Sequence, residues 1–144
     1  MLGAILIVAV AAACGEKRDP ARRAIDEIVA AANRQDASGI VSGLAPDFQA
    51  ADGTGRADAE ATLRQYLAAY ESLDVTISDL TIETAAGAAR ARFLAELSGK
   101  PRSVGGLDRF LPRRSKYRFD LRLAPDAGGG DRWLVTWAGW EQTE

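Results

Sequence analysis

Apolar positions in the first half of the chain recur every three or four residues, a period that predicts three helices. The first covers residues 20–33, because Asp19 is a good N-cap and a proline follows at the first helical position. A second, short helix begins after Asp36 and ends before Pro46, and a third covers residues 57–73. Their apolar stripes are Ala24, Ile25, Ile28, Val29 and Ala32; Ile40, Val41 and Leu44; and Leu63, Tyr66, Leu67 and Tyr70.

From Asp74 onward the period changes to two, which is typical of strands with one buried face and one wet face. The predicted strands cover residues 75–82 (bent at Ser78-Asp79), 88–97, 115–123 and 132–141. In the last strand, Trp133 and Trp137 are expected on one face and Trp140 on the other. The sequence therefore predicts an α+β domain with a bent antiparallel sheet of about four strands.

The chain opens with an uninterrupted apolar run, Leu2 to Ala13, that stops at Cys14, the only cysteine. As a helix this run would be about 18 Å long, well short of the roughly 30 Å hydrocarbon core of a bilayer. It therefore fits a secretory signal better than a membrane span. With small residues directly before the cysteine, it resembles the lipobox of bacterial lipoproteins, in which the cysteine is lipidated. The alternatives are an ordinary cleaved signal and a buried first helix.

We accordingly divide the chain into a signal peptide (1–14), a short tether (15–18) and a single domain (19–144). The resemblance implies a bacterial cell-envelope protein that is anchored to the membrane by a lipid on Cys14 and faces the periplasm. Gly15 is not the aspartate that favours inner-membrane retention in enterobacteria, so we expect the outer membrane. Five residues reach at most roughly 17 Å, so the domain is expected to sit close to the bilayer.

Charge is segregated along the chain, although the net charge is only −2. Residues 19–89 carry twelve acidic and five basic side chains, and residues 90–122 carry ten basic and three acidic ones. Because the total is slightly acidic and the leader is secretory, nucleic acid is not an expected partner. The chain has no histidine, the commonest general base near neutral pH and the commonest transition-metal ligand. We expect no metal and no cofactor.

The order of helices and strands resembles the NTF2-like superfamily, also described as SnoaL-like or cystatin-like. The resemblance spans residues 20–142 and rests on the helix at Ile25–Ile28, the stretch Leu44–Phe48, the helix from Gly55 to Leu67 and the final Arg132-Trp133 strand. It implies three N-terminal helices packed in the concavity of the curved sheet, with a cone between them that often holds a pocket. Members often have a short strand pair after the second helix, and only residues 48–51 supply part of it here.

Enzymes of this superfamily, such as ketosteroid isomerase and scytalone dehydratase, use a pocket Asp, His or Tyr for acid–base catalysis. The candidates here are Asp47 as the carboxylate and Tyr66 as the donor. A buried carboxylate with a raised pKa can act as a base beside a tyrosine. The alternative, which we favour, is that Asp47 is a turn residue and that the tyrosines belong to the core.

Aromatic side chains from the third helix and the inner face of the sheet are expected to converge as a ligand pocket in the cone. They are Tyr66, Tyr70, Phe93, Tyr117, Phe119, Trp133 and Trp137. Such a lining suits a small apolar ligand, and the small side chains of Ala89 and Ala91 on the same face leave room for one. The same residues also suit a filled core.

A basic segment, Ser98–Arg114, joins two predicted strands and is longer than a hairpin requires. Its candidate surface-contact residues are Lys100, Arg102, Arg109, Phe110, Arg113 and Arg114. Basic and apolar side chains together suit an anionic membrane surface or an anionic envelope polymer. The alternative is a solvated loop in which Phe110 tucks under the sheet.

The outer face of the sheet is expected to carry arginines opposite acidic side chains. The arginines are Arg90, Arg92, Arg118 and Arg122, and the acids are Glu96 and Asp120. Cross-strand ion pairs explain this pattern. The alternative is a docking surface for an acidic partner, including the acidic half of a second copy in a homodimer.

Three functions follow from these patterns. We expect a membrane-anchored envelope lipoprotein whose non-catalytic domain binds a small apolar ligand or an envelope protein. The second interpretation is a small-molecule enzyme of the isomerase or dehydratase type. The third is a protein-docking or oligomerisation module that uses the arginine-rich face.

Overall fold

The computed structural model describes residues 19–103, 109 and 111–143. The predicted signal peptide, Cys14, the tether and Phe110 lie outside these residues. The elements in chain order are α2 (Pro20–Asn33), α3 (Ala37–Ser42), β1 (Leu44–Ala50), α4 (Arg56–Ala68), β2 (Tyr70–Ala85), β3 (Ala88–Pro101), β4 (Arg114–Pro125) and β5 (Trp133–Thr143). None of the helices in the described part of the chain is long and apolar enough to cross a membrane.

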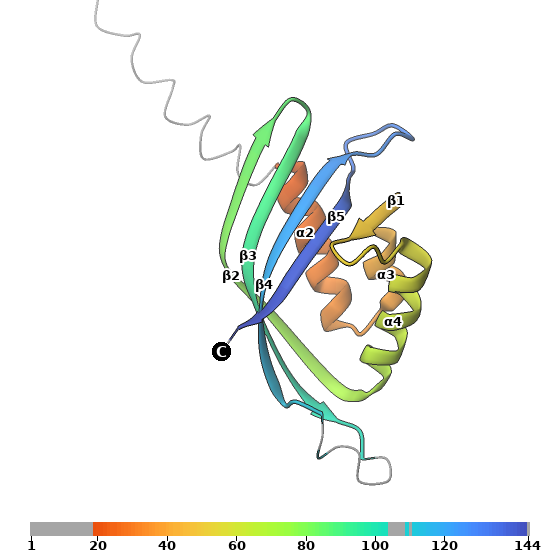
Figure 1. Cartoon of the computed structure of the whole chain (residues 1–144), viewed down its shortest axis with the longest axis vertical. Helices are drawn as coiled ribbons and strands as arrows, with labels where there is room; N and C mark the ends of the chain where they lie inside the picture. The colour runs from red at the N-terminus through yellow and green to blue at the C-terminus, as the bar shows by residue number, and fades with distance from the viewer. Residues whose placement is uncertain (1–18, 104–108, 110, 144) are drawn as a thin grey trace, which may run out of the picture.

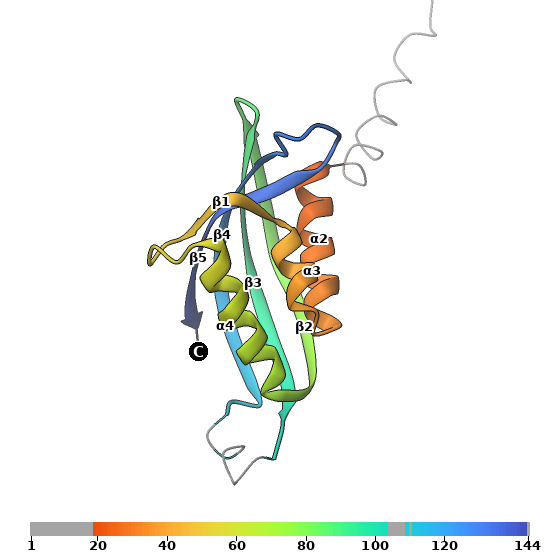
Figure 2. The ribbon, with the colours of Figure 1, turned by 90° about the vertical axis from the view of Figure 1, so that its right-hand side faces the viewer.

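The strands form one strongly bent sheet in the order β1-β5-β4-β3-β2 (Figure 1). Strands β2 to β5 pair antiparallel, and β1 pairs parallel with β5 at one edge. All three helices lie on the concave side of the sheet (Figure 2). We call this the inner face and the uncovered convex side the outer face.

The first two helices begin where the sequence predicts. Asp19 caps α2 by accepting a hydrogen bond from the Ala21 amide at 3.0 Å, and Asp36 caps α3 by accepting one from the Gly39 amide at 3.0 Å. The apolar stripe of α2 turns toward the sheet and buries Ile25 almost completely. Capping and helical periodicity together therefore define these elements.

The second helix is shorter than predicted, and a fifth strand follows it. Leu44 was expected on the helix, but α3 ends at Ser42 and Leu44 opens β1, opposite Val135 of β5. Pro46 lies within this strand, where an edge position tolerates a residue that lacks an N–H donor. The four predicted antiparallel strands are present as β2 to β5, and the sheet has a fifth strand, β1, which pairs parallel with β5.

Two arginines hold the junction between α3 and β1. Arg56 donates hydrogen bonds to the carbonyl oxygens of Val41, at 3.1 Å, and Leu44, at 3.3 Å. Arg132 donates to the Ser42 carbonyl at 2.6 Å. These contacts satisfy carbonyls at the end of a short helix, which have no partner within it.

The third helix also ends earlier than predicted. It stops at Ala68, and Tyr70 opens β2 instead of lying on the helix stripe. The Gln35 amide donates to the carbonyls of Leu67, at 3.0 Å, and Tyr70, at 2.9 Å, and so ties this corner to the end of α2. The predicted bend in β2 is confirmed: its pairing with β3 shifts between Ser78 and Thr81.

The alternation predicted for β3 and β4 is confirmed. Inner-face positions of β3 and β4 are buried or half-buried, and the arginines between them are exposed. The core that these strands share with the helices and β5 includes Ala89, Ala91, Phe93, Ala95, Leu121, Leu123, Val135 and Ala138. The alanines of β3 share this core with Ala21, Ala24 and Ile25 of α2.

The tryptophans of β5 do not alternate as predicted. Val135 lies opposite Leu123 and Trp137 opposite Arg122, so the register shifts by one residue at Thr136. A bulge of this kind moves every later side chain to the other face. Trp137 is consequently on the outer face, and Trp140 lies opposite Phe119 on the inner face.

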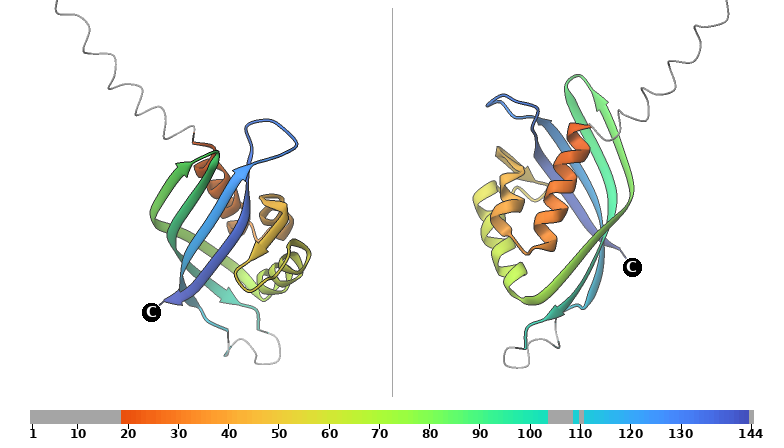
Figure 3. Two further views of the ribbon diagram at one scale, coloured as in Figure 1. Left: turned by 45° about the horizontal axis from the view of Figure 1, so that its top comes forward. Right: turned by 180° about the vertical axis from the view of Figure 1, so that it is seen from behind.

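The start of α2 and the basic segment lie at opposite ends of the sheet (Figure 3). Strand β3 runs from Ala88 near the first end to Pro101 near the second, and its fourteen residues span about 45 Å. The point at which the chain enters the described domain is therefore far from the basic segment.

Asn33 protects the free edge of β2. Its side-chain oxygen accepts a hydrogen bond from the Val75 amide at 2.7 Å, and its amide donates to the Val75 carbonyl at 3.1 Å. We predict that Asn33→Ala lowers the free energy of unfolding by about 1 kcal/mol, because two hydrogen bonds are lost at a site where water replaces them. Urea unfolding measures the change. Arg34→Ala, at the next exposed position, is the control and is expected to change it by less than about 0.5 kcal/mol.

Candidate functional site

Three tyrosines lie together near the basic end of the sheet: Tyr66 of α4, Tyr70 of β2 and Tyr117 of β4. Tyr66 of α4 lies beside Tyr70, with ring centroids 5.3 Å apart. Tyr70 is only 1% exposed, and its hydroxyl donates to the Pro112 carbonyl at 2.8 Å. Tyr70 is therefore a satisfied core residue, whereas Tyr66 is half-buried and borders the inner face.

Tyr66 is held in its neutral form. Burial raises the pKa of its hydroxyl well above the ordinary value, nearby Tyr70 and Tyr117 raise it further, and a hydrogen bond with Ser115 acts in the opposite direction. Ser115 is the one buried polar side chain among the described residues. Tyr66 is accordingly a hydrogen-bond donor and not a base at physiological pH.

A row of aromatic rings crosses the inner face beside these tyrosines. Phe93 and Phe119 stack with centroids 5.3 Å apart, and Tyr117 and Trp140 each lie 6.2 Å from Phe119. We call these four residues the aromatic cluster. Trp140 is 51% exposed, so the cluster presents a large apolar side chain to solvent. The exposed indole continues a row of more buried rings, so an apolar ligand that contacted Trp140 would also lie close to Phe119.

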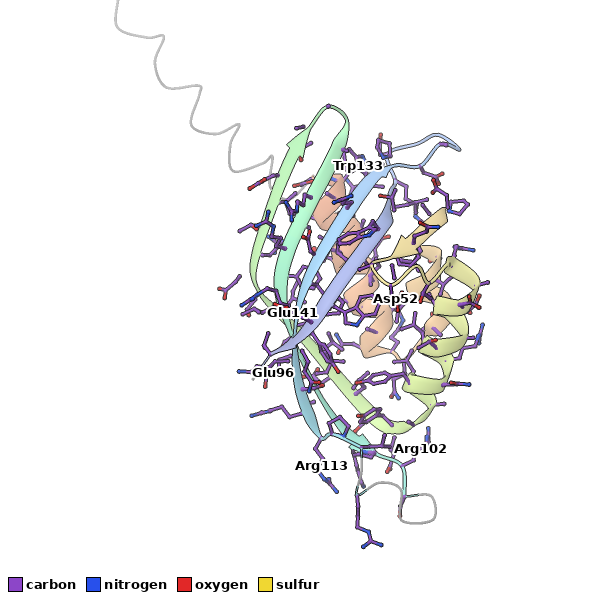
Figure 4. All side chains as sticks on the ribbon, viewed as in Figure 1. Asp52, Glu96, Arg102, Arg113, Trp133 and Glu141 are labelled. Carbon is purple, nitrogen blue, oxygen red and sulfur yellow. The ribbon has the colours of Figure 1, made fainter. Side chains whose placement is uncertain are left out.

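The predicted pocket residues do not all converge. Tyr66, Tyr70, Phe93, Tyr117 and Phe119 lie together. Trp133 is at the other end of β5 (Figure 4), beside a hollow of about 280 Å³ at the start of α2. Trp137 lies outside the cone, on the outer face. Strict alternation along β5 predicted Trp137 on the inner face and Trp140 on the outer face. The bulge at Thr136 reverses the two, so that Trp140 lies on the inner face.

Asp47 does not lie in the cone. It is exposed on β1, which contradicts a role as a pocket carboxylate. Every Asp and Glu within residues 19–103 and 111–143 is exposed or only half-buried. In the same part of the chain, no three carboxylates lie close enough together to hold a metal ion. The described inner face thus offers hydroxyls and aromatic rings, but no carboxylate.

The basic segment is shorter than predicted, because β3 extends to Pro101 and β4 begins at Arg114. Several of its cations contact the domain itself. Lys100 lies 3.5 Å from Glu71, Arg114 lies 3.0 Å from Glu96, and the Arg102 guanidinium donates to the Ala68 carbonyl at 2.9 Å. Arg109 and Arg113 are exposed, and the side chains of Arg102 and Arg113 mark this end of the molecule (Figure 4).

The outer face carries the predicted arginines, but some of them pair with acidic side chains other than the predicted ones. Arg90 donates two hydrogen bonds to Asp120, at 2.6 and 3.0 Å, as predicted. Glu96 pairs with Arg114 instead, and Arg118 pairs with Glu141 at 3.1 Å. A hollow of about 360 Å³ lies among Arg90, Arg92, Arg118, Phe119, Asp120, Gly139, Trp140 and Glu141.

Trp137 and Arg122 pair across β5 and β4 on the outer face. The Arg122 guanidinium lies 4.7 Å from the centre of the Trp137 ring, a cation–π contact. The ring covers Gly139, where an added Cβ would come within 2.7 Å of it. A side chain at residue 139 would therefore require the Trp137 indole to shift. Neither contact is visible in the sequence, since both depend on the bulge at Thr136.

The Asp120–Arg90 pair predicts a pH-dependent effect on stability. The Arg90 guanidinium is the main cause that holds the pKa of Asp120 below its ordinary value of 3.8, with smaller contributions from Arg92 and Arg122. A lowered pKa stabilises the folded state above the ordinary pKa, and this stabilisation is lost as the pH falls through the folded-state pKa. We therefore expect Asp120→Asn to lower the urea midpoint at pH 7 and to leave it nearly unchanged near pH 2.

The control for this prediction is Glu141→Gln, which removes a pair exposed by more than half on both sides. It should shift the midpoint less than Asp120→Asn at pH 7. Equal shifts in the two variants, or a shift in Asp120→Asn that persists near pH 2, would contradict the assignment.

No protein-family model and no curated protein matches this sequence. Solved structures do match. An NTF2-like protein of unknown function from Pseudomonas putida is 19% identical and has a TM-score of 0.64, with 83% of this chain and 82% of that chain covered. An NTF2-like superfamily protein from Salmonella enterica is 14% identical, with a TM-score of 0.66 and coverage of 85% and 87%. A ketosteroid isomerase-like protein from Erwinia carotovora is 15% identical, with a TM-score of 0.62 and coverage of 85% and 93%.

At these identities the likeness shows the fold alone. The domain is an α+β domain with the NTF2-like, or cystatin-like, fold, built from one five-stranded sheet and three helices.

Proposed function

We propose that this chain is a lipid-anchored lipoprotein of the bacterial cell envelope whose NTF2-like domain binds a small apolar ligand without catalysis. The anchor is the lipid on Cys14, and the domain faces the periplasm, from the outer membrane in preference to the inner. One observation carries the binding role: the inner face exposes an aromatic cluster, with Trp140 half in solvent, and has no buried carboxylate among the described residues.

The chemistry of the aromatic cluster favours an apolar molecule with one polar atom. Phe119 and Trp140 supply apolar area, and aromatic rings give large contact area with little loss of side-chain freedom. Tyr66 and Ser115 supply hydroxyls at the border of the cluster. An aromatic surface with these hydroxyls at its border would orient a ligand by a single hydrogen bond, while the rings supply most of the affinity.

Among the described residues no base is positioned on the inner face, which weighs against the isomerase or dehydratase alternative. Acid–base catalysis near neutral pH needs a group that takes up and releases a proton in that range. Tyr66 has a raised pKa, Asp47 is exposed on β1, and the chain has no histidine. The ketosteroid isomerase-like neighbour shares the fold at 15% identity, and fold likeness does not transfer an activity.

Binding can be tested with N-phenyl-1-naphthylamine, an uncharged dye whose fluorescence rises in apolar sites. We expect a saturable rise on titration into the protein. Trp140→Ala should weaken binding by about tenfold, the equivalent of roughly 1.4 kcal/mol of aromatic contact.

The matched control is Trp137→Ala, because Trp137 lies on the same strand but on the outer face. It should leave dye binding unchanged. The ligand role is wrong if the dye does not bind, or if the two variants weaken binding equally.

A second candidate function, protein docking through the outer face, is favoured by the hollow among the arginines. Arg90 and Arg122 lie directly opposite each other in register, an arrangement that leaves like charges adjacent. Within the described chain, Arg92 lines the hollow and forms no ion pair with a carboxylate. An acidic partner protein would supply a carboxylate for Arg92. The docking function therefore predicts a bound protein, whereas the ligand-binding function predicts a bound apolar molecule.

A further inference from the structure

We infer that the end of the domain at which α2 begins rests on the lipid surface, so that the sheet stands away from the bilayer. This inference rests on the proposed lipid anchor at Cys14. The chain enters the described domain at Asp19, the N-cap of α2. The five residues that link Cys14 to this point reach at most roughly 17 Å. The anchor therefore restricts this end of the domain, and not the other, to the headgroup region.

Two hairpin tips lie at the same end as the start of α2 (Figure 1). The β2–β3 tip consists of exposed alanines and Gly87, and the β4–β5 tip consists of Ala127 and three glycines. Asp126 flanks the second tip, and its side chain accepts a hydrogen bond from the Gly128 amide at 3.0 Å, so it faces its own turn. Neither tip presents a charge at its apex, which lowers the cost of resting against headgroups.

The surface between the tips and α2 has a composition suited to a membrane interface. Trp133 borders a hollow of about 280 Å³ together with Pro20, Ala24, two arginines (Arg23 and Arg132) and two acidic residues (Glu27 and Asp131). Indole rings favour the headgroup level, and arginines there can contact lipid phosphates. Arg132 also donates to the Ser42 carbonyl, which fixes its position on the domain. The contact proposed here is with the bilayer surface as a whole, and the hollow is only part of it.

The opposite end of the sheet is about 45 Å away along β3. It carries the exposed cations Lys100, Arg109 and Arg113, and the aromatic cluster lies between it and the middle of the sheet. An upright domain holds these groups out in the aqueous compartment. The ligand or partner would then arrive from the periplasm and not from the membrane to which the protein is anchored.

Site-directed fluorescence in vesicles tests this orientation. The full-length lipidated protein would be reconstituted in vesicles of phosphatidylcholine and phosphatidylglycerol that contain a headgroup-labelled nitroxide lipid. Acylation occupies the Cys14 thiol, so a single new cysteine can carry the fluorophore. The variants are Ala86→Cys and Ala127→Cys at the proposed contact, Arg113→Cys at the far end and Arg92→Cys on the outer face, all at exposed positions.

We expect the nitroxide to quench the labels at residues 86 and 127 several-fold more than those at 113 and 92. Equal quenching at all four sites, or stronger quenching at 113, overturns the upright orientation. Stronger quenching at 92 also overturns it, because the outer face would then lie on the lipid. Mass spectrometry of the same samples distinguishes a failure of the proposed lipid anchor from a failure of the proposed orientation. If the chain carries no acyl group and does not bind the vesicles, the anchor is refuted, and the orientation with it.

Discussion

Replacing Cys14 with serine should move nearly all of the protein from the membrane fraction to the soluble fraction while the domain still folds. A serine cannot form the thioether that carries the lipid, and each buried CH₂ of an acyl chain contributes about 0.8 kcal/mol to membrane binding. The apolar run before it is too short to replace the anchor. Membrane fractionation and incorporation of labelled palmitate measure the two losses, and circular dichroism reports the fold.

Folding should be unaffected because the described residues contain a hydrophobic core of their own, from Ala21 in α2 to Ala138 in β5. Gly15→Ser is the matched control: it introduces the same residue next to an intact Cys14 and should leave the protein acylated and on the membrane. If Cys14→Ser also stays on the membrane with its label, the lipoprotein hypothesis is wrong.

Local chemistry was enough to predict much of the fold. Asp19 and Asp36 cap helices through contacts within three residues, so their positions can be read directly from the sequence. The alternation in β3 and β4 gave the correct faces, because every side chain there follows the strict two-residue period of a strand.

The features that local patterns do not predict depend on contacts between residues far apart in the chain. Strand β1 exists because Leu44 pairs with Val135, about ninety residues later, and Pro46 reads locally as a helix terminator. The faces of Trp137 and Trp140 depend on a bulge that appears only when β5 is set against β4. Local patterns do not carry this information, since pairing register is a property of two strands.

In the candidate site, too, some residues follow from local patterns and others depend on long-range strand pairing. Tyr66 was predicted beside Tyr117 and Phe119, because helical and strand periods each place their own residues on the inner face. Trp140 was missed, and Asp47 was a wrong candidate because it lies on the unpredicted strand β1. The bulge at Thr136 therefore changes the predicted site more than any other single feature.

Leu123→Ala is expected to cost about 2 to 5 kcal/mol of unfolding free energy, the range for truncating a fully buried leucine. Leu123 is 1% exposed on the inner face of β4, between Ala89 of β3 and Val135 of β5. These neighbours belong to hydrogen-bonded strands and cannot move in to fill the space, so a cavity remains. Urea unfolding at constant pH measures the loss, with an unchanged m-value as evidence that the unfolded state is the same.

Leu94→Ala makes the same truncation on the outer face, where Leu94 of β3 is half-buried and lies opposite Arg118 of β4. We expect a loss of about 1 kcal/mol or less, because less apolar area is withdrawn from water and solvent fills the space. The difference between the two leucines measures how far the helices seal the inner face. Equal losses would mean that the outer face is also covered in solution, as in the docking alternative, whereas a small loss for Leu123→Ala would mean that the helices do not pack against β4 as described.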